Sequence, residues 1–244
     1  MPNVPDGTLR AALLQCGHIH PDLVPEHGDY PEAFADLLGP HGIELVTVDV
    51  AEDGVPDPDE HDAWLVSGSA SSAYDPLPWI SDLEELLRSL VDREAPLVAV
   101  CFGHQVLAQA LGSTVAKADA GWGVGAHDYR LVGGPRPWMD PASDGSVRLI
   151  ASHQDQVVEL PEGAELVATT DHCPVAAYTV GPAALAIQPH PEFTAAVSRG
   201  LVERRRDLIG ADRSDEALRS LDQPLDRDLV ATWMARFLRE ASSR

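Results

Sequence analysis

The segment PLVAVCFGHQVLAQALG, residues 96–112, places a cysteine at the junction between a short strand and a helix. Its residues 97–100 are all apolar, which is typical of a strand buried on both faces of a sheet. After Gly103 the apolar residues recur at helical spacing, and the pattern stops at Gly112. The segment therefore predicts a buried strand that turns directly into a helix, with Cys101 at the turn.

Strands and helices alternate on the N-terminal side of this segment. Apolar runs of strand length occupy 9–15, 43–50 and 63–69, and helical patterns occupy 30–42 and 79–94. This order predicts an α/β fold of three layers, in which helices flank a mostly parallel central sheet.

The C-terminal side is rich in short strands and ends in helices. Turn-forming Gly, Pro and Asp residues separate the apolar runs, which we expect to form the last core strands and a small antiparallel addition. The chain is helical from Thr194 onward, with an amphipathic pattern over 225–241. No linker is long enough to separate domains, so residues 1–244 are expected to form a single domain. The short strands are expected at 127–133, 146–152, 164–170, 175–180 and 184–188.

The composition is strongly acidic, with 17 Lys and Arg against 39 Asp and Glu residues and a formal net charge of −22. This charge repels phosphate backbones and anionic lipids, so we expect neither nucleic acid nor a membrane as partner. The basic cluster Arg204-Arg205-Arg206 is interpreted as a solvated helix face.

Three cysteines, Cys16, Cys101 and Cys173, are widely spaced and indicate neither a disulfide framework nor a CxxC metal site. The N-terminal residues show no basic leader before a long apolar core, and no run approaches the roughly 18 apolar residues of a membrane span. We therefore expect a cytoplasmic protein in a reducing compartment, with Cys16 and Cys173 inert.

The position of Cys101 allows two interpretations. In a nucleophile elbow, the sharp turn lifts the side chain above the sheet edge, and a small residue such as Gly103 relieves the crowded backbone. The positive end of the following helix favours a thiolate, and its free amides can receive an oxyanion. Alternatively, Cys101 is a small buried hydrophobic residue, a common fate of free cysteines.

A thiol nucleophile needs a base and a group that orients the base. His190 follows an apolar strand and lies between two prolines that restrict its backbone, and Glu192 comes two residues later. The Glu192 carboxylate can bind one ring nitrogen of His190 and leave the other free to face Cys101. The alternative is a surface turn that carries an exposed histidine and glutamate.

A loop of small residues, SGSASSA (67–73), follows the strand at 63–69. Such a loop allows a close approach of its backbone, so the amide of Gly68 or Ser69 can donate to an oxyanion. The alternative is a flexible serine-rich turn.

Three motifs in this order resemble the class I glutamine amidotransferase family: SGSASSAYDPLPWI (67–80), AVCFGHQVLAQALG (99–112) and IQPHPEF (187–193). The chain is most similar to stand-alone members that resemble the amidotransferase domain of GMP synthase. The resemblance extends from LLQCG (13–17) to the final helix, and it implies the flavodoxin-like fold of that family.

The resemblance also implies a reaction. Cys101 would attack the γ-carboxamide of glutamine, or a γ-glutamyl amide or peptide, and form a γ-glutamyl thioester. His190 would transfer the proton and Glu192 would orient His190, which gives a Cys-His-Glu triad. The amide of Phe102 would join that of Gly68 or its neighbour Ser69 in binding the oxyanion.

Further substrate contacts are implied for Gln105, which would bind the glutamine, while His104 is expected to face packing or solvent. The segment of Ser152, His153, Gln154 and Asp155 would hold the amino-acid end of the substrate. A metal site formed by His153, Asp155 and His190 is the alternative use of these residues. We favour the substrate loop and the triad, and we expect no metal and no cofactor.

Three functions compete. The first is a self-sufficient cysteine hydrolase that acts on glutamine or on a γ-glutamyl compound. The second is a glutaminase subunit that supplies ammonia to a separate synthetase, since the sequence contains no GxxxxGK[ST] nucleotide-binding motif. The third is a non-catalytic binding protein with the same fold, and the presence of Cys101, His190 and Glu192 argues against it.

Overall fold

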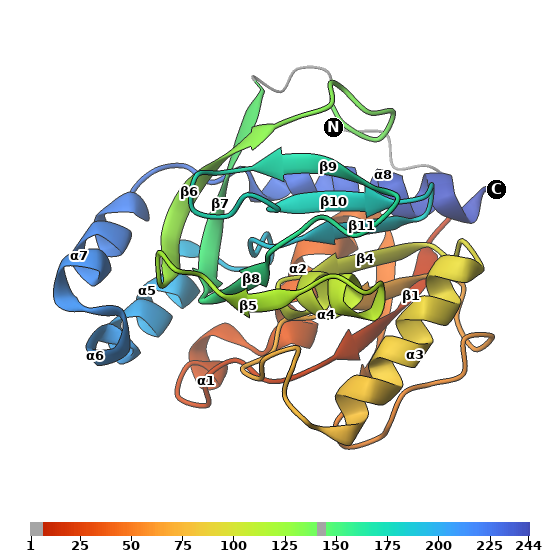
Figure 1. Cartoon of the computed structure of the whole chain (residues 1–244), viewed down its shortest axis with the longest axis horizontal. Coiled ribbons are helices and arrows are strands. Elements are labelled where there is room, and N and C mark those ends of the chain that lie inside the picture. Colours follow the sequence, from red (N-terminus) through yellow and green to blue (C-terminus); the bar gives the residue numbers. More distant parts are fainter. Residues whose placement is uncertain (1–6, 141–144) are drawn as a thin grey trace.

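The computed structural model describes residues 7–140 and 145–244. Its centre is a nine-stranded sheet with the strand order β2-β1-β3-β4-β11-β10-β9-β6-β7 (Figure 1). The strands of this sheet are β1 (Leu9–Gln15), β2 (Ile43–Asp49), β3 (Trp64–Val66), β4 (Leu97–Val100), β6 (Gly123–Leu131), β7 (Ser146–His153), β9 (Ala164–Thr169), β10 (Ala177–Val180) and β11 (Ala184–Ile187).

The sheet has a parallel and an antiparallel half. The strands β2, β1, β3, β4 and β11 pair in parallel. The strands β10, β9, β6 and β7 continue the same sheet through antiparallel pairs. The predicted α/β fold with a central sheet and flanking helices is therefore confirmed, and the antiparallel addition is an extension of the main sheet.

Helices cover both faces of the parallel half (Figure 1). Along β4, Leu97 and Ala99 belong to the core beneath α3 and α4, whereas Val98 and Val100 belong to the core beneath α2 and α8. This two-residue alternation explains why the strand is apolar throughout. The helices are α1 (Val24–His27), α2 (Tyr30–Leu38), α3 (Pro78–Asp92), α4 (Phe102–Ala110), α5 (Ala195–Arg204), α6 (Arg206–Ile209), α7 (Ala211–Ser220) and α8 (Arg227–Ser242).

The expected helix at 30–42 is shorter in the structure. Asp29 caps its start in a capping box with Glu32, and the α-helix ends at Leu38, before a 3-10 turn over Gly39–His41. Pro40 has no amide to continue the helical hydrogen bonds, which accounts for the early end.

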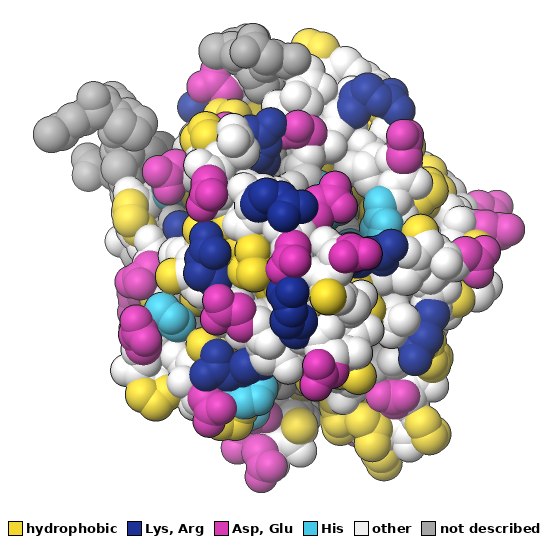
Figure 2. All heavy atoms as spheres, turned by 90° about the vertical axis from the view of Figure 1, so that its left-hand side faces the viewer, with side chains coloured by type: hydrophobic (Ala, Val, Ile, Leu, Met, Phe, Trp, Pro, Cys, Tyr) yellow, Lys and Arg dark blue, Asp and Glu magenta, His cyan; other side chains and the backbone are white. Residues whose placement is uncertain are grey.

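Two short strands were not expected from the sequence. β5 (Val115–Lys117) and β8 (Asp155–Val157) form a separate antiparallel pair. Each has only three residues, too few to show a two-residue hydrophobic period. None of the helices in the described part of the chain combines the length and apolar character that a membrane crossing requires. Over α5–α7, Arg side chains are interspersed with Asp and Glu (Figure 2).

The register of β4 and β11 brings two distant segments to one edge of the sheet. Val100, the last residue of β4, lies opposite Ile187, the last residue of β11. Because these neighbouring strands are parallel, the residues that follow them emerge at the same edge. Cys101 follows β4 directly, and His190 follows β11 by three residues.

Candidate active site

Cys101 occupies a strained turn between β4 and α4. Its backbone has φ +54° and ψ −102°, in a region that residues with a side chain rarely adopt. The amide of Cys101 donates to the carbonyl oxygen of Ile187 at 2.8 Å, and its own carbonyl accepts from the Gln105 amide at 3.1 Å. The sheet and the new helix therefore hold the turn in the geometry of a nucleophile elbow.

Gly103 allows α4 to start this close to the sheet. A Cβ at this position would lie 2.9 Å from both the Cβ and the carbonyl oxygen of Val66. The Gly103 amide donates to the Ser67 carbonyl at 3.2 Å. The Phe102 amide is the first of the helix and has no acceptor within it, and the Phe102 ring packs against Trp79.

His190 is fixed by its backbone, its ring face and one ring nitrogen. Its amide donates to the Ile150 carbonyl at 2.8 Å, and its ring stacks on Phe193 with 4.1 Å between centroids. Nδ1 donates to Glu192 Oε1 at 2.6 Å. The Glu192 side chain is fully buried, and Arg227 donates to the carbonyl oxygens of Pro191 and Glu192 at 2.8 and 3.0 Å.

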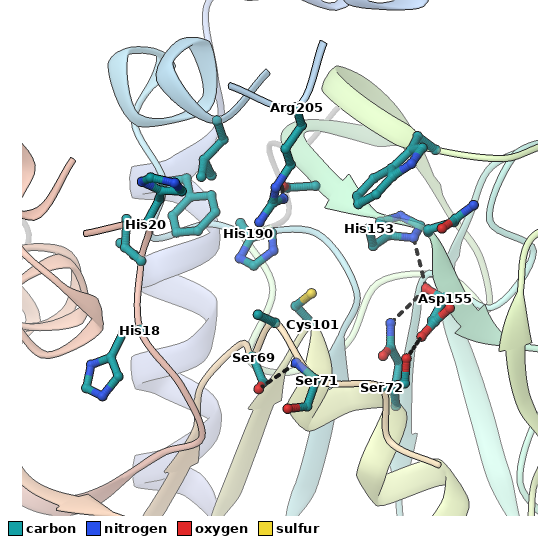
Figure 3. Close-up of a pocket in the computed structure, with 18 of the residues that line it drawn as sticks. His18, His20, Ser69, Ser71, Ser72, Cys101, His153, Asp155, His190 and Arg205 are labelled. Atoms are coloured by element: carbon teal, nitrogen blue, oxygen red, sulfur yellow. Dashed lines mark hydrogen bonds between the residues drawn. The ribbon is translucent and has the colours of Figure 1, made fainter. Parts of the chain in front are cut away.

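The charge of His190 depends on its neighbours. Burial alone lowers its pKa, but the interactions of the ring with Cys101 and Glu192 outweigh burial and raise the pKa to about 10. Figure 3 shows the Cys101 sulfur and the His190 ring in the same cavity. This arrangement favours an imidazolium beside the cysteine at neutral pH.

The glycine loop lies directly against this pair. A Cβ on Gly68 would lie 2.5 Å from the Tyr30 hydroxyl oxygen and 3.2 Å from His190 Cε1. Only glycine fits there without displacing one of these side chains. Ser69 and Ser71 lie below Cys101 in Figure 3, and the Ser71 amide donates to Ser69 Oγ at 3.1 Å.

The opposite wall joins α4 to β8. Gln105 Nε2 donates to the Asp155 carbonyl oxygen at 2.7 Å and to Gln188 Oε1 at 3.1 Å. The Asp155 carboxylate accepts from the Ser72 hydroxyl at 2.6 Å and from the Tyr74 hydroxyl at 3.1 Å. These hydrogen bonds thus hold Gln105 and Asp155 in the wall between the serine loop and β8.

His153 is a neutral part of the same wall. Its Nδ1 donates to the Asp155 carbonyl oxygen at 3.1 Å. Burial, together with the nearby His172 and His190, lowers the pKa of His153 to about 3. Among residues 7–140 and 145–244, no group of three His, Cys, Asp or Glu side chains is placed to hold a metal ion.

These walls enclose a cavity of about 330 Å³. Of the catalytic and substrate-binding residues expected from the sequence, Gly68, Phe102 and Glu192 are not among the residues that line the cavity, and the others line it. The lining residues expected from the sequence are Ser69, Cys101, Gln105, Ser152, His153, Gln154, Asp155 and His190. The lining residues that the sequence did not reveal include His18, His20, Tyr30, Lys117, Trp122, Phe193 and Arg205.

Arg205 corrects one interpretation of the sequence. The arginine cluster was assigned to a solvated helix face, yet Arg205 lines the cavity and donates from Nη1 to Ser152 Oγ at 3.2 Å. Arg205 lies between α5 and α6, and a helix break of this kind is not visible in a charge pattern. His104 is fully buried against the Tyr178 ring, and burial lowers its pKa to about 3.

Comparisons with known proteins agree with this fold and identify its family. The family model for glutamine amidotransferase class-I matches residues 31–204. Gamma-glutamyl peptidase 4 of Arabidopsis thaliana is 30% identical over 184 residues, 73% of each chain. A GMP synthase of Ralstonia pickettii is 32% identical over 187 residues, which cover 69% of this chain and 33% of that protein.

A solved structure extends the agreement to the whole fold. A glutamine amidotransferase from Thermotoga maritima superimposes with a TM-score of 0.74 at 19% identity, over 97% of this chain and 98% of that chain. The chain therefore belongs to the class I glutamine amidotransferase family.

Proposed function

We propose that this protein is a cysteine hydrolase that cleaves the γ-amide bond of glutamine or of a γ-glutamyl amide or peptide. The observation that carries the proposal is the position of Cys101, at a strained turn, in one cavity with His190, which is hydrogen-bonded to Glu192. The relatives named gamma-glutamyl peptidase support the same bond type. One nine-stranded sheet takes its strands from Leu9 to Ile187, and α8 shares a core with it, which supports one domain over residues 1–244.

The reaction begins with attack of the Cys101 sulfur on the γ-carbonyl carbon. The oxyanion accepts hydrogen bonds from the Phe102 amide and from the amide of Gly68 or Ser69. His190, which holds the thiol proton, transfers it to the leaving nitrogen as the C–N bond breaks. An amine or ammonia leaves, and a γ-glutamyl thioester remains on Cys101.

Water completes the cycle. His190 removes a proton from water, whose oxygen attacks the thioester carbonyl carbon. The C–S bond breaks, glutamate is released, and the proton returns to the sulfur. Glu192 keeps His190 oriented through the 2.6 Å bond to Nδ1, which leaves Nε2 for the substrate side.

A second function, ammonia supply to a separate synthetase, draws on the similarity to GMP synthase. The matched region covers only 33% of that protein. Glutaminase activity of the purified chain separates the two functions. Activity without any partner supports the hydrolase, whereas activity that appears only after a synthetase is added supports the subunit.

Labelling tests the nucleophile directly. A glutamine-mimicking electrophile should attach to Cys101, as mapped by mass spectrometry, and turnover should be lost with labelling. Label on Cys16 or Cys173, or full turnover in Cys101→Ala, refutes the proposal. All three cysteines are free and buried, which fits the reducing, cytoplasmic setting that we also propose.

A further inference from the structure

Three consecutive arginines at the end of α5 have different surroundings. Arg204 forms an ion pair with Asp22 at 3.5 Å, and Arg206 forms one with Asp215 at 2.7 Å. Arg205, between them, has no acidic partner among the described residues. Consecutive residues of a helix point roughly 100° apart, and the break between α5 and α6 lets Arg205 reach the cavity (Figure 3).

Two contacts position the Arg205 guanidinium, one with Trp122 and one with Ser152. It lies 5.6 Å from the Trp122 ring centroid and bonds Ser152 Oγ through Nη1. Trp122 is itself fixed, because Arg213 Nη1 donates to the carbonyl oxygens of Ala120 and Trp122 at 2.7 Å each. A stacked guanidinium with remaining N–H groups is arranged for a planar anion.

The charges of the cavity favour an anion over a cation. Lys117 is the only other Lys or Arg residue of the lining, and it too has no acidic partner among the residues described. The acidic residue of the lining, Asp155, already accepts hydrogen bonds from Ser72 and Tyr74. In a chain of net charge −22, two cations without acidic partners in one cavity offer a site for negative charge.

We propose that Arg205, positioned by Trp122 and Ser152, binds a carboxylate of the substrate and sets the specificity of the cavity. This inference rests on the proposed function, because the anion must share the cavity with the bond that Cys101 attacks. Two carboxylates are available in a γ-glutamyl peptide: the α-carboxylate of the γ-glutamyl group and a carboxylate on the leaving amine. Glutamine carries only the first.

Steady-state kinetics with three substrates tests the assignment. The substrates are glutamine, γ-glutamylglycine and γ-glutamylglycinamide, which lacks the leaving-group carboxylate. Arg205→Gln should raise KM at least about tenfold for the substrate whose carboxylate it binds, with a small change in kcat. Arg205→Lys should raise KM less, because it keeps the charge but loses the planar fork. Arg206→Gln is the matched control and should change neither constant.

The substrate pattern identifies the carboxylate. A KM increase confined to γ-glutamylglycine assigns Arg205 to the leaving group, and an equal increase for all three substrates assigns it to the α-carboxylate. Unchanged KM values in Arg205→Gln overturn the inference while the proposed function stands. If Arg205→Gln fails to fold by circular dichroism, the KM pattern of Arg205→Lys decides.

Failure of the proposed function gives a different result. In that case the wild-type protein hydrolyses none of the three substrates. Calorimetric titration of γ-glutamylglycine into the wild-type protein and Arg205→Gln then still tests the carboxylate site. Weaker binding to the variant supports the inference, and equal binding, or none to either protein, overturns it.

Discussion

Two strand ends at the same edge of the sheet carry a cysteine, and only one of them has the geometry of a nucleophile. Cys16 follows β1, and Cys101 follows β4. Both are nearly inaccessible, with 2% and 6% of their surface exposed. Burial raises the pKa of the Cys16 thiol well above its usual range, and its sulfur lies 3.5 Å from the Leu14 carbonyl oxygen.

The difference lies in the backbone and in what faces the sulfur. The chain at Cys101 has a positive φ and starts a helix, whereas a loop follows Cys16. Cys101 lies in a cavity with His190, whose pKa it raises. The exposed fraction alone does not separate a reactive from an inert cysteine; the turn and the facing imidazole do.

Removal of the two thiols gives the largest contrast. Cys101→Ala should lower kcat/KM by a factor on the order of 10⁴ or more, since no other group can form the thioester. Cys16→Ala should keep kcat/KM within about twofold, because Cys16 does not line the cavity. Hydrolysis of a γ-glutamyl compound by both variants measures this contrast, and equal losses in both would contradict it.

Replacement of the imidazole and its partner comes next. His190→Gln should approach the loss of Cys101→Ala, because proton transfer disappears. The rate loss in Glu192→Gln should be roughly 10- to 100-fold smaller than in His190→Gln, since orientation of the ring is only part of the effect. Single-turnover release of the amine measures both variants. A Glu192→Gln enzyme with wild-type rates would show that the 2.6 Å contact has no role in turnover.

A smaller effect on kcat is expected when Gly68 gains a methyl group. Gly68→Ala would place a Cβ 2.5 Å from the Tyr30 hydroxyl oxygen and 3.2 Å from His190, so kcat should fall about tenfold or more through displacement of the imidazole. Gly39→Ala is the matched control, because no atom lies within 4 Å of its added Cβ. Comparable kcat values in the two variants would argue against a tightly packed loop.

The smallest expected effect is a shift in the pKa of His190. The His190 pKa of about 10 lies above the unfolded value of about 6.5. The protonated ring therefore stabilises the folded state fully below about pH 6.5, and this contribution is lost as the pH rises through about 10. Burial lowers this pKa and the Cys101 charge raises it. Cys101→Ala should therefore lower the pKa, and the loss of stability should begin at lower pH.

NMR titration of the His190 ring is the measurement for this last prediction. Cys16→Ala serves as its control and should leave the titration of His190 unchanged. An identical His190 midpoint in wild-type protein and Cys101→Ala would mean that the two side chains are not coupled.

The sequence predicted those parts of the site that depend on local rules. The strand and helix around Cys101 were readable because four apolar residues, a turn and a helical period follow one another within residues 97–112. His190 and Glu192 were readable because two prolines restrict their backbone. The β5–β8 pair was missed because three-residue strands show no period.

Other contributions were visible only in three dimensions. Tyr30 approaches His190 from the start of α2, and Trp122 and Arg205 meet across segments more than 80 positions apart in the chain numbering. Arg205 was assigned to solvent because a run of three arginines has no internal difference in its sequence. Arg204 and Arg206 form ion pairs with Asp22 and Asp215. The break between α5 and α6 instead lets Arg205 reach the cavity.

The sequence by itself determined most of the order of strands and helices and the turn at Cys101, because these follow from hydrophobic periodicity and backbone restriction within short segments. The candidate roles of Cys101, His190 and Glu192 came from the resemblance of three motifs to a known family. Only the tertiary structure decided which of the buried cysteines faces an imidazole and which arginine faces the cavity. The parallel register of β4 and β11 brings the first pair to one edge, and the packing of α5 beside Trp122 and Ser152 places the second. Contacts between distant segments leave no periodic trace in a single chain, so they had to be seen in the fold.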